Sequence, residues 1–496
     1  MKKFFTNLKD YYFFYFHFKS EIKKYKKKNK KLKNRNLNIV VPIFYWGGTN
    51  VTYLQLQFAL NFIKNGANVY FIYDNQIEFK LSYFVHSLII RKIIRQFKKN
   101  LNAELINFNT AKSANLEKKY EQIAKNKEYF NLQWIEKRSI KYSEFLISPK
   151  KISRNIQICE NMENLMHRNN IDLCFCPGGI HGNSFLWRKV CDVNNIRFSS
   201  FDGNKTKTIV TLSGMAAHRD DVLSRLSDLK NDNENLNNSI TDAVYLEIYK
   251  RSKLSYDNID DLYLRTTKNK ADPKLIAKFV EDYASTKSKY ENYLEQVAIF
   301  LNTSWDAASA DLEPWEETQI DWLDKLILDL SKGHTKKIII RQHPDEKFFP
   351  SNDNYEKIIS NYQNRYQHLT FDFFKSENSI SSYAIIKEST SVFTFSSTIG
   401  LEACILNRAS FIYKKNYQLE TKSLIRYVPN CLDLCAREYF QNENILKNNA
   451  INAYFYGQHE GWEDISIPNF LNDLKNNVIK KRISEISKNI VNNSYN

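Results

Sequence analysis

Short apolar runs of strand length alternate with amphipathic stretches through most of the chain. In the first half, the run Ile39–Phe44 is followed by the amphipathic stretch Val51–Asn65, which ends at Gly66, and by a second run, Val69–Tyr73. This alternation predicts a strand, a helix and a parallel strand. Further strands are predicted at Leu105–Phe108, Leu173–Cys176, Arg197–Phe201, Val297–Leu301, Ile338–Arg341, Leu369–Phe373, Val392–Phe395 and Ser410–Tyr413. We therefore expect an α/β protein with two doubly wound, Rossmann-like lobes.

Polar residues follow two of the predicted strands in the second half. Ile338–Arg341 stops at Gln342-His343-Pro344, and Val392–Phe395 stops at Ser396-Ser397-Thr398, where a helix is expected to begin. In an open parallel sheet both groups lie at the carboxyl edge, where ligands bind. Hydroxyl groups and free amides at a helix start attract an anion, so we expect a phosphate there. His343 could donate to a second phosphoryl oxygen or to a leaving group.

The order and spacing of these motifs resemble the donor-binding domain of GT-B glycosyltransferases that build capsule polysaccharides. The resemblance rests on Arg-x-His-Pro at 341–344, Ser-Ser-Thr-x-Gly-x-Glu-Ala at 396–403, and the upstream stretches 301–307 and 321–323. It covers residues 296–415 well and the N-terminal half in outline. The sequence departs from the family pattern at Asn407-Arg408-Ala409, where such families tend to have Gly-Lys-Pro.

This resemblance implies two lobes that face each other across a cleft, with a nucleotide sugar in the second lobe and a glycan or lipid-linked acceptor in the cleft. It also implies transfer of a sugar to a growing surface glycan such as capsule or O-antigen. The donor-binding candidates are Asn302, Trp305, Asp306, Arg341, His343, Ser396, Ser397, Thr398 and Glu402. Three of them have an equally plain structural alternative: core packing for Trp305, helix capping for Asp306 and a dipole-stabilising surface position for Glu402.

Polar residues also follow strands of the first lobe. Leu173–Cys176 leads into a Pro-Gly-Gly turn with His181, and Arg197–Phe201 leads into Asp202, while His218 lies just beyond. In a GT-B enzyme the acceptor hydroxyl needs a base from this lobe. His181, Asp202 and His218 are therefore the catalytic candidates, although a single histidine is more often a hydrogen-bonded structural residue.

Changes in composition divide the chain into five segments. We expect a basic aromatic tail at 1–36, the first lobe at 37–218, a helical insertion or linker at 219–295, the second lobe at 296–430, and C-terminal helices at 431–496. The resemblance implies that the last segment crosses back over the first lobe. Its length is sufficient for that.

The positive charge is concentrated at the N-terminus. With 72 Lys and Arg against 55 Asp and Glu, the chain carries a formal charge of +17, much of it before Asn36. No arginine-rich stripe is interleaved with aromatic residues, so nucleic acid is not an expected partner. The aromatic run Tyr11–Phe18 is too short to cross a bilayer, and Lys9 and Asp10 interrupt any signal-peptide core. We expect a cytoplasmic protein whose residues 1–36 either lie on the anionic inner face of the membrane or form a disordered solubilising tail.

Neither a metal nor another cofactor is expected. The seven cysteines form no Cys-x-x-Cys pair and mostly lie within apolar segments, which is typical of buried, reduced thiols. The sequence contains no Asp-x-Asp, the carboxylate pair that holds Mg²⁺ and diphosphate in metal-dependent glycosyltransferases. Helix N-termini, Arg341, His343 and the 396–398 hydroxyls would then meet the charge on the departing nucleotide.

Three other functions could use the same kind of site. A CDP-glycerol-type glycerophosphotransferase would release CMP and form a phosphate-linked product. A sugar-nucleotide epimerase would turn over a UDP-sugar without an acceptor. A non-catalytic partner in polysaccharide assembly would have no affinity for nucleotides.

Overall fold

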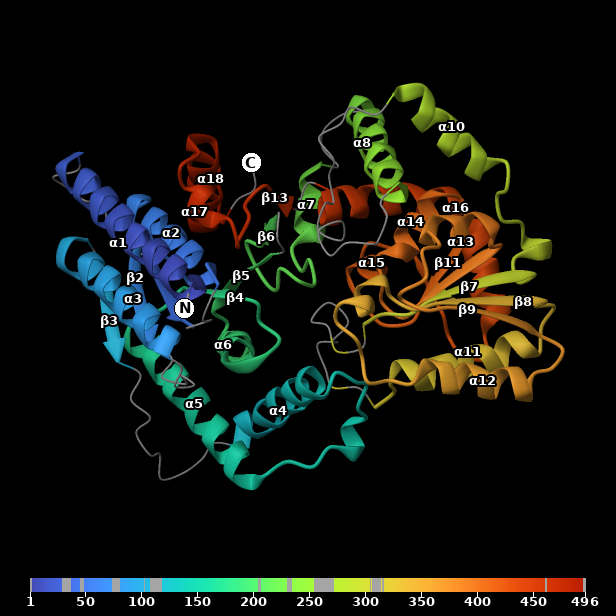
Figure 1. Cartoon of the computed structure of the whole chain (residues 1–496), viewed down its shortest axis with the longest axis horizontal. Helices are drawn as coiled ribbons and strands as arrows, with labels where there is room; N and C mark the ends of the chain where they lie inside the picture. Colours follow the sequence, from blue (N-terminus) through green and yellow to red (C-terminus); the bar gives the residue numbers. More distant parts are fainter. Residues whose placement is uncertain are drawn as a thin grey trace. The chain divides into compact units, whose positions relative to one another are not determined.

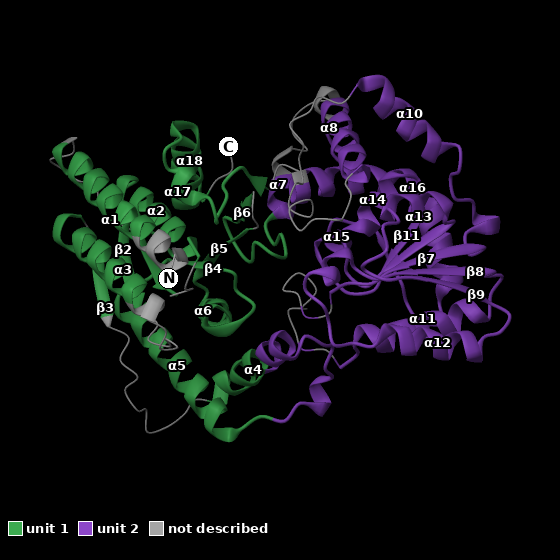
Figure 2. Ribbon diagram, in the orientation of Figure 1, with its two compact units in different colours: residues 1–128, 147–221, 462–496 green, residues 129–146, 222–461 purple. Residues whose placement is uncertain are grey.

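The computed structural model divides the chain into two compact units (Figures 1 and 2). Unit 1 contains residues 1–128, 147–221 and 462–496, and unit 2 contains residues 129–146 and 222–461. The structure describes residues 2–28, 37–44, 49–73, 81–101, 103–107, 118–203, 207–229, 234–253, 272–303, 305, 314, 316–459 and 462–493. Each unit is built on its own sheet.

The sheet of unit 1 has the strand order β13-β6-β5-β4-β1-β2-β3. Strands β1 to β5 are parallel, and β6 and β13 add to one edge in antiparallel fashion. Within the parallel part the order is 3-2-1-4-5, which is a doubly wound arrangement. The strands are β1 (Asn38–Ile43), β2 (Asn68–Tyr73), β3 (Ala103–Asn107), β4 (Leu173–Pro177), β5 (Arg197–Gly203), β6 (Thr208–Val210) and β13 (Trp462–Glu463).

The sheet of unit 2 is parallel throughout and has the order β12-β11-β10-β7-β8-β9. Counted from its first strand, this is 3-2-1-4-5-6, the order of a Rossmann fold. The prediction of two Rossmann-like α/β lobes is therefore confirmed. The strands are β7 (Gln296–Phe300), β8 (Lys337–Arg341), β9 (Thr370–Phe374), β10 (Ser391–Thr394), β11 (Ala409–Ile412) and β12 (Ile425–Arg426).

Helices cover both faces of each sheet. In unit 2, α11 and α12 lie on one face and α13, α14 and α16 on the other (Figure 1). The helices are α1 (Lys2–Lys28), α2 (Val51–Lys64), α3 (Leu81–Asn100), α4 (Glu121–Glu136), α5 (Pro149–Arg168), α6 (Gly182–Val193), α7 (Val222–Leu229), α8 (Glu234–Ser252), α10 (Pro273–Ala284), α11 (Gln319–Ser331), α12 (Tyr355–Arg365), α13 (Ser382–Glu388), α14 (Ile399–Ile405), α15 (Tyr417–Glu420), α16 (Leu432–Tyr454), α17 (Phe470–Asp473) and α18 (Asn477–Asn492).

Helix α11 illustrates how local sequence fixes an element. Thr318 and Asp321 form a reciprocal capping box, in which each side chain accepts from the other residue's backbone N–H. From there Trp322, Leu326 and Leu330 are buried at a spacing of four residues, so one stripe of the helix faces the sheet. This is the alternation of buried and exposed positions that an amphipathic helix on a sheet requires.

The N-terminal segment is not a separate tail. Helix α1 packs on α2 and α3 and buries Tyr11, Phe14, Phe18 and Ile22 in the core of unit 1. These residues recur every three or four positions, which places them on one helical face. The alternative of a disordered solubilising tail at 1–36 is thereby corrected for residues 2–28, because part of their aromatic run supplies core packing. The expectation that this segment lies on an anionic membrane surface stays a prediction.

Two other boundaries differ from those expected. Residues 129–146, which lie within the predicted first lobe, belong to unit 2. Residues 462–496 belong to unit 1, where β13 pairs with β6 and α18 packs on α2, whereas α16 stays with unit 2. The return of residues 462–496 to the first lobe agrees with what the family resemblance implies, although the predicted segment began at residue 431. The place of residues 129–146 in unit 2 is not revealed by residue pattern alone.

Candidate functional site

Three adjacent strands of unit 2 end in polar residues at the same level. Thr394 of β10 pairs with Phe300 of β7, and Phe300 pairs with Arg341 of β8. Two positions beyond this row of paired residues lie Ser396, Asn302 and His343. The sheet register therefore brings these three predicted residues to one stretch of its carboxyl edge, where open α/β sheets bind ligands.

Asn302 and Ser396 join the ends of β7 and β10. The Asn302 amide donates to Ser396 Oγ at 3.2 Å, and Ser396 N donates to Asn302 Oδ1 at 3.2 Å. β7 and β10 are the two strands between which the winding direction of the sheet reverses. This pair of hydrogen bonds therefore spans the topological switch point, which is the usual position of a nucleotide in this fold.

Gln319, which is not among the residues predicted from the sequence, fixes the Asn302 backbone. Its Oε1 accepts from Asn302 N at 2.8 Å, and its Nε2 donates to Asn302 O at 3.1 Å and to Tyr355 Oη at 2.6 Å. The side chain is fully buried at the start of α11. An amide that satisfies both backbone groups of one residue holds that residue rigidly. No periodicity in the sequence singles out Gln319.

His343 caps the short 3₁₀ turn Pro344–Lys347 that follows β8. Its Nδ1 accepts from Asp345 N at 3.1 Å, and about a third of its side chain is exposed. When the neutral ring uses Nδ1 as an acceptor, Nε2 carries the proton. His343 is thus set up to donate from Nε2, the chemistry that contact with a phosphoryl oxygen requires.

A buried carboxyl group supports this turn from beneath. Glu346 Oε2 accepts from Gln342 Nε2 at 2.6 Å and from Ser351 Oγ at 2.8 Å. Burial raises the pKa of Glu346, and the two hydrogen bonds oppose that shift. Glu346 thereby links the two ends of the loop that carries His343.

Ser397 and Thr398 open helix α14, but they cap it only weakly. Ser397 Oγ accepts from Ile399 N at 3.4 Å, and the Thr398 hydroxyl makes no capping hydrogen bond. Both side chains are half-buried. The expected cap by the whole hydroxyl cluster is thus reduced to one long contact, because Thr398 has helical φ and ψ angles of −66° and −17°. Its hydroxyl remains available to a ligand.

Arg341 is a structural residue rather than a phosphate ligand. It is 1% exposed, and its guanidinium donates to the carbonyls of Lys375 and Asn378 in the loop after β9. Its side chain therefore holds that loop against the end of β8. This corrects the expectation that Arg341 meets the charge of the nucleotide.

Glu402 likewise points into the protein. Its side chain is fully buried, with Oε1 accepting from Arg251 and Oε2 accepting from Tyr383 Oη at 2.5 Å. Arg251 also donates to Tyr454 Oη at 2.9 Å. Both carboxylate oxygens of Glu402 therefore accept hydrogen bonds inside unit 2. Glu402 occupies neither the surface position nor the ribose-contacting position that was predicted for it.

Trp305 packs against a segment from the first half of the sequence. Its ring meets Trp134 edge to face at 5.1 Å, and the Lys137 ammonium lies 3.5 Å from the centroids of both rings. Phe349, from the loop after β8, lies 6.4 Å away. Trp305 is 8% exposed, which fits the packing alternative. Asp306 lies outside the described residues.

Residues 129–146 are anchored to unit 2 by several polar contacts, so the Trp134–Lys137 contact is part of a fixed segment. Ser139 N and Oγ donate to Asp353 Oδ2 at 3.2 and 3.3 Å, and Lys141 pairs with Asp321 at 2.8 Å. Sequence reasoning missed Trp134 and Lys137, because their partner Trp305 is far away along the chain.

The candidates of unit 1 lie near the carboxyl ends of β4 and β5. His181 follows β4 as the N-cap residue of α6, after Gly178 and Gly179 with positive φ angles of 71° and 128°. Asp202 is the second-last residue of β5, the strand that pairs with β4. His181 and Asp202 thus come from neighbouring strands. His218 lies in the turn after β6, and all three side chains are half-buried.

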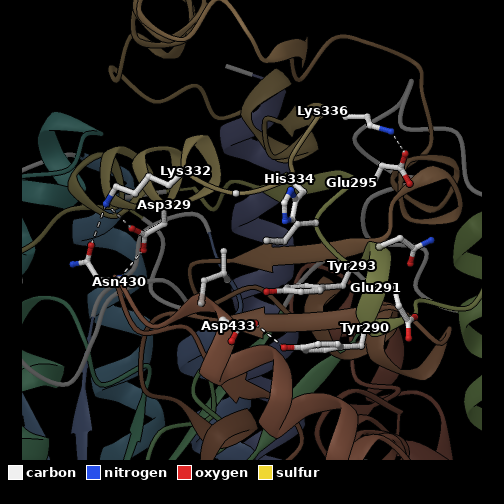
Figure 3. A pocket seen from close by; sticks show the side chains of 14 residues that line it. Tyr290, Glu291, Tyr293, Glu295, Asp329, Lys332, His334, Lys336, Asn430 and Asp433 are labelled. Carbon is white, nitrogen blue, oxygen red and sulfur yellow. Dashed lines mark hydrogen bonds and ion pairs between the residues drawn. The ribbon is translucent and has the colours of Figure 1, made fainter.

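A pocket of about 670 Å³ opens at the opposite edge of the unit 2 sheet (Figure 3). It is lined by residues that precede β7 and β8, including Tyr290, Tyr293, His334 and Lys336, and by Asp433 from α16. Tyr290 donates to Asp433, and Lys336 pairs with Glu295. None of the predicted donor-binding residues lines this pocket, so it is distinct from the carboxyl-edge site.

The described residues offer neither a cluster of metal ligands nor a membrane-spanning helix. Among the described residues, no group of three or more His, Cys, Asp or Glu side chains is arranged to hold a metal ion. In the same part of the chain, no helix has the length and apolar content needed to cross a bilayer.

No protein-family model matches the sequence, and no curated protein matches it. Solved structures with a similar chain path include UDP-GlcNAc 2-epimerase from Neisseria meningitidis bound to UDP-GlcNAc, at 10% identity and a TM-score of 0.24, covering 90% of this chain and 99% of that one. MurG from Acinetobacter baumannii has 10% identity and a TM-score of 0.27, with coverage of 90% and 99%. Sucrose-phosphate synthase from Thermosynechococcus elongatus has 10% identity and a TM-score of 0.27, with coverage of 92% and 100%. The fold is shown by the doubly wound strand orders of the two sheets.

Proposed function

We propose that this protein is a glycosyltransferase that takes a sugar from a nucleotide-sugar donor bound by unit 2. The observation that carries the proposal is the row formed by Ser396, Asn302 and His343 at the ends of three adjacent strands. Two of the three are tied to each other across the topological switch point. A nucleotide bound there would present its phosphates to this row.

The role of the site is to stabilise the departing nucleoside diphosphate. An acceptor oxygen attacks the anomeric carbon, the bond from that carbon to the phosphate oxygen breaks, and negative charge grows on the diphosphate. His343 Nε2–H and the hydroxyls of Ser397 and Thr398 donate to that charge. Donors fixed before the reaction act without reorganisation, which makes them effective without a metal. The absence of Asp-x-Asp from the sequence supports a metal-independent reaction.

The acceptor side of the reaction is proposed for unit 1. The acceptor hydroxyl must lose its proton as the new glycosidic bond forms, and His181, Asp202 and His218 are the candidates for the base. We propose a surface glycan, such as capsule or O-antigen, as the acceptor class. The basis for that choice is the sequence resemblance over residues 296–415.

A nucleotide-binding panel tests the proposal. Wild-type protein is titrated with UDP, GDP, CDP and CMP, and the melting temperature is recorded. One base class should raise it, since a ligand at 100 times its Kd stabilises the folded state by about 2.7 kcal/mol. EDTA should leave the binding unchanged. Stabilisation by none of the four would refute the nucleotide-sugar assignment.

Turnover then separates the reaction types. With the matching nucleotide sugar, a transferase consumes donor only when an acceptor glycan is present. Turnover of a UDP-sugar without acceptor would identify an epimerase instead, and release of CMP with a phosphate-linked product would identify a glycerophosphotransferase.

A further inference from the structure

Helices α1 and α3 of unit 1 lie side by side and run in the same direction (Figure 1). The Tyr11 ring stacks on His86 at 4.7 Å, Phe18 meets Phe97 at 6.0 Å, and Lys26 Nζ donates to Asn100 Oδ1 at 3.4 Å. These contacts advance together along both helices. The N-terminal half of α1 therefore lies beside the N-terminal half of α3, and the C-terminal halves lie beside each other.

Each helix presents one outward stripe at helical spacing. On α1 this stripe consists of the exposed residues Tyr12, Phe16, Lys19, Lys23 and Lys27, and on α3 of the exposed residues Leu88, Lys92, Arg95 and Lys99. We call these nine residues the α1/α3 surface. Because the helices are parallel, the apolar members gather at one end of the surface and the six cations at the other.

The apolar members are well exposed. Phe16 is 60% exposed, Tyr12 48% and Leu88 41%. A charged helix face usually serves only to keep a protein soluble. That role does not explain why three large apolar side chains are exposed next to the charges. Their exposure next to a cationic patch indicates contact with a partner that is both apolar and anionic.

The cations of the α1/α3 surface are not neutralised by the protein. Within the described part of the chain, none of the six pairs with a carboxylate. Helix α3 contains no acidic residue, and Glu21 of α1 is taken up by Lys24 and Lys64. The positive field of this patch is therefore open to an external anion.

We propose that the α1/α3 surface docks on a bilayer rich in anionic phospholipids. Tyr12, Phe16 and Leu88 enter the headgroup layer, and the lysines and Arg95 face the lipid phosphates. A nucleic acid would satisfy the cations but would leave the aliphatic Leu88 without a favourable partner, so the mixed surface favours lipid. This inference does not depend on the nucleotide site of unit 2.

Sedimentation of the full-length protein with lipid vesicles tests the docking. Binding is expected to vesicles of phosphatidylcholine with 30% phosphatidylglycerol, to weaken at 1 M NaCl, and to be lost with phosphatidylcholine alone. Each cation near an anionic surface strengthens binding about fivefold. The quadruple variant Lys19→Gln, Lys23→Gln, Lys92→Gln and Arg95→Gln should therefore bind roughly 600-fold more weakly.

A matched control removes the same charge elsewhere. The variant Lys274→Gln, Lys278→Gln, Lys357→Gln and Arg365→Gln changes four exposed residues of unit 2 and should bind vesicles like the wild type. All eight positions are exposed, so both variants should melt like the wild type. Equal losses in both variants would mean attraction by net charge only, and would overturn the proposal.

Two further measurements distinguish a lipid partner from a nucleic-acid partner: vesicle binding by the Phe16→Gln variant, and binding of the protein to transfer RNA. Phe16→Gln keeps every charge and should weaken binding to the anionic vesicles at least threefold. Transfer RNA should not bind the α1/α3 surface at 0.15 M salt. Binding of transfer RNA that the quadruple variant abolishes, together with unchanged vesicle binding by Phe16→Gln, would contradict docking on a membrane.

Discussion

At the scale of single residues, side chains with similar expected roles in unit 2 separate into two groups. Asn302, Ser396 and His343 end neighbouring strands and keep polar atoms at the carboxyl edge. Arg341 and Glu402 carry charge into the interior, where carbonyls and a counter-ion satisfy them. The first group follows from local pattern. The second depends on partners such as Arg251, which is 151 residues from Glu402.

Replacing Glu402 by Gln should destabilise the protein. The change leaves Arg251 largely buried without its counter-charge, which costs about 3 kcal/mol or more. Urea unfolding measures the loss. Glu420→Gln breaks an exposed pair with Lys415 and should cost less than about 1 kcal/mol. If the Glu402→Gln protein had normal stability but bound nucleotide more weakly, the structural role of Glu402 would be contradicted. The predicted contact of Glu402 with the ribose would then be supported instead.

At the scale of elements, α14 must begin very close to β10 for Ser396–Thr398 to reach the carboxyl edge. Gly400 makes this possible. A Cβ atom there would lie 3.1 Å from Thr394 Oγ1 and 3.1 Å from Leu424 Cδ1, tighter than most such contacts. The glycine of the Ser-Ser-Thr-x-Gly motif therefore sets the distance between helix and sheet.

The Gly400→Val substitution tests this spacing. The added methyl groups should push α14 away from β10, lower the free energy of unfolding by about 1–3 kcal/mol and weaken nucleotide binding. Gly333→Ala, whose Cβ would meet Leu294 Cδ1 at 3.4 Å, is the matched control and should change little. Normal nucleotide affinity in Gly400→Val would show that the position of α14 does not matter to the site.

Packing of α1 on α3 should depend on pH through His86. The ring is buried between Tyr11 and Tyr53, and burial lowers the pKa of His86 from 6.5 to about 4. Since the unfolded chain binds the proton first, the stability due to neutral His86 is complete above pH 6.5. It is lost as the pH falls toward 4, by roughly 3 kcal/mol in all.

Thermal unfolding between pH 4 and 7.5 measures this dependence. His86→Phe keeps an aromatic ring and removes the titration, so its stability relative to the wild type should rise as the pH falls below 6.5. His368→Ala, at an exposed position, should leave the wild-type profile unchanged. Parallel profiles for the wild type and His86→Phe would contradict this role of His86.

At the scale of the whole molecule, the sequence revealed the two sheets and the polar strand ends of unit 2. Strand and helix patterns are local, and the carboxyl edge of a parallel sheet follows from them. The family resemblance implied that the C-terminal segment returns to the first lobe, and residues 462–496 do so. The start of that return at residue 462 and the place of residues 129–146 in unit 2 could not be predicted. Trp134 and Lys137 reach Trp305, and residues 462–493 complete unit 1, through contacts that no periodicity encodes.

The aromatic N-terminus shows the same limit. A run of aromatic residues followed by lysines fits a membrane-lying segment and a folded amphipathic helix alike. The structure separates the two faces: Tyr11, Phe14 and Phe18 are buried, whereas Tyr12 and Phe16 are exposed. The sequence alone did not show that α3 would supply the second stripe of cations.

Calorimetric titration of the full-length protein with the nucleoside diphosphate found in the panel tests the central claim most directly. His343→Ala and Ser397→Ala should each weaken binding about tenfold, and the double variant should lose less than the sum, because both groups contact the same phosphates. His368→Ala should bind like the wild type. If His343→Ala and Ser397→Ala bind as tightly as His368→Ala, no phosphate site exists at this edge of the sheet.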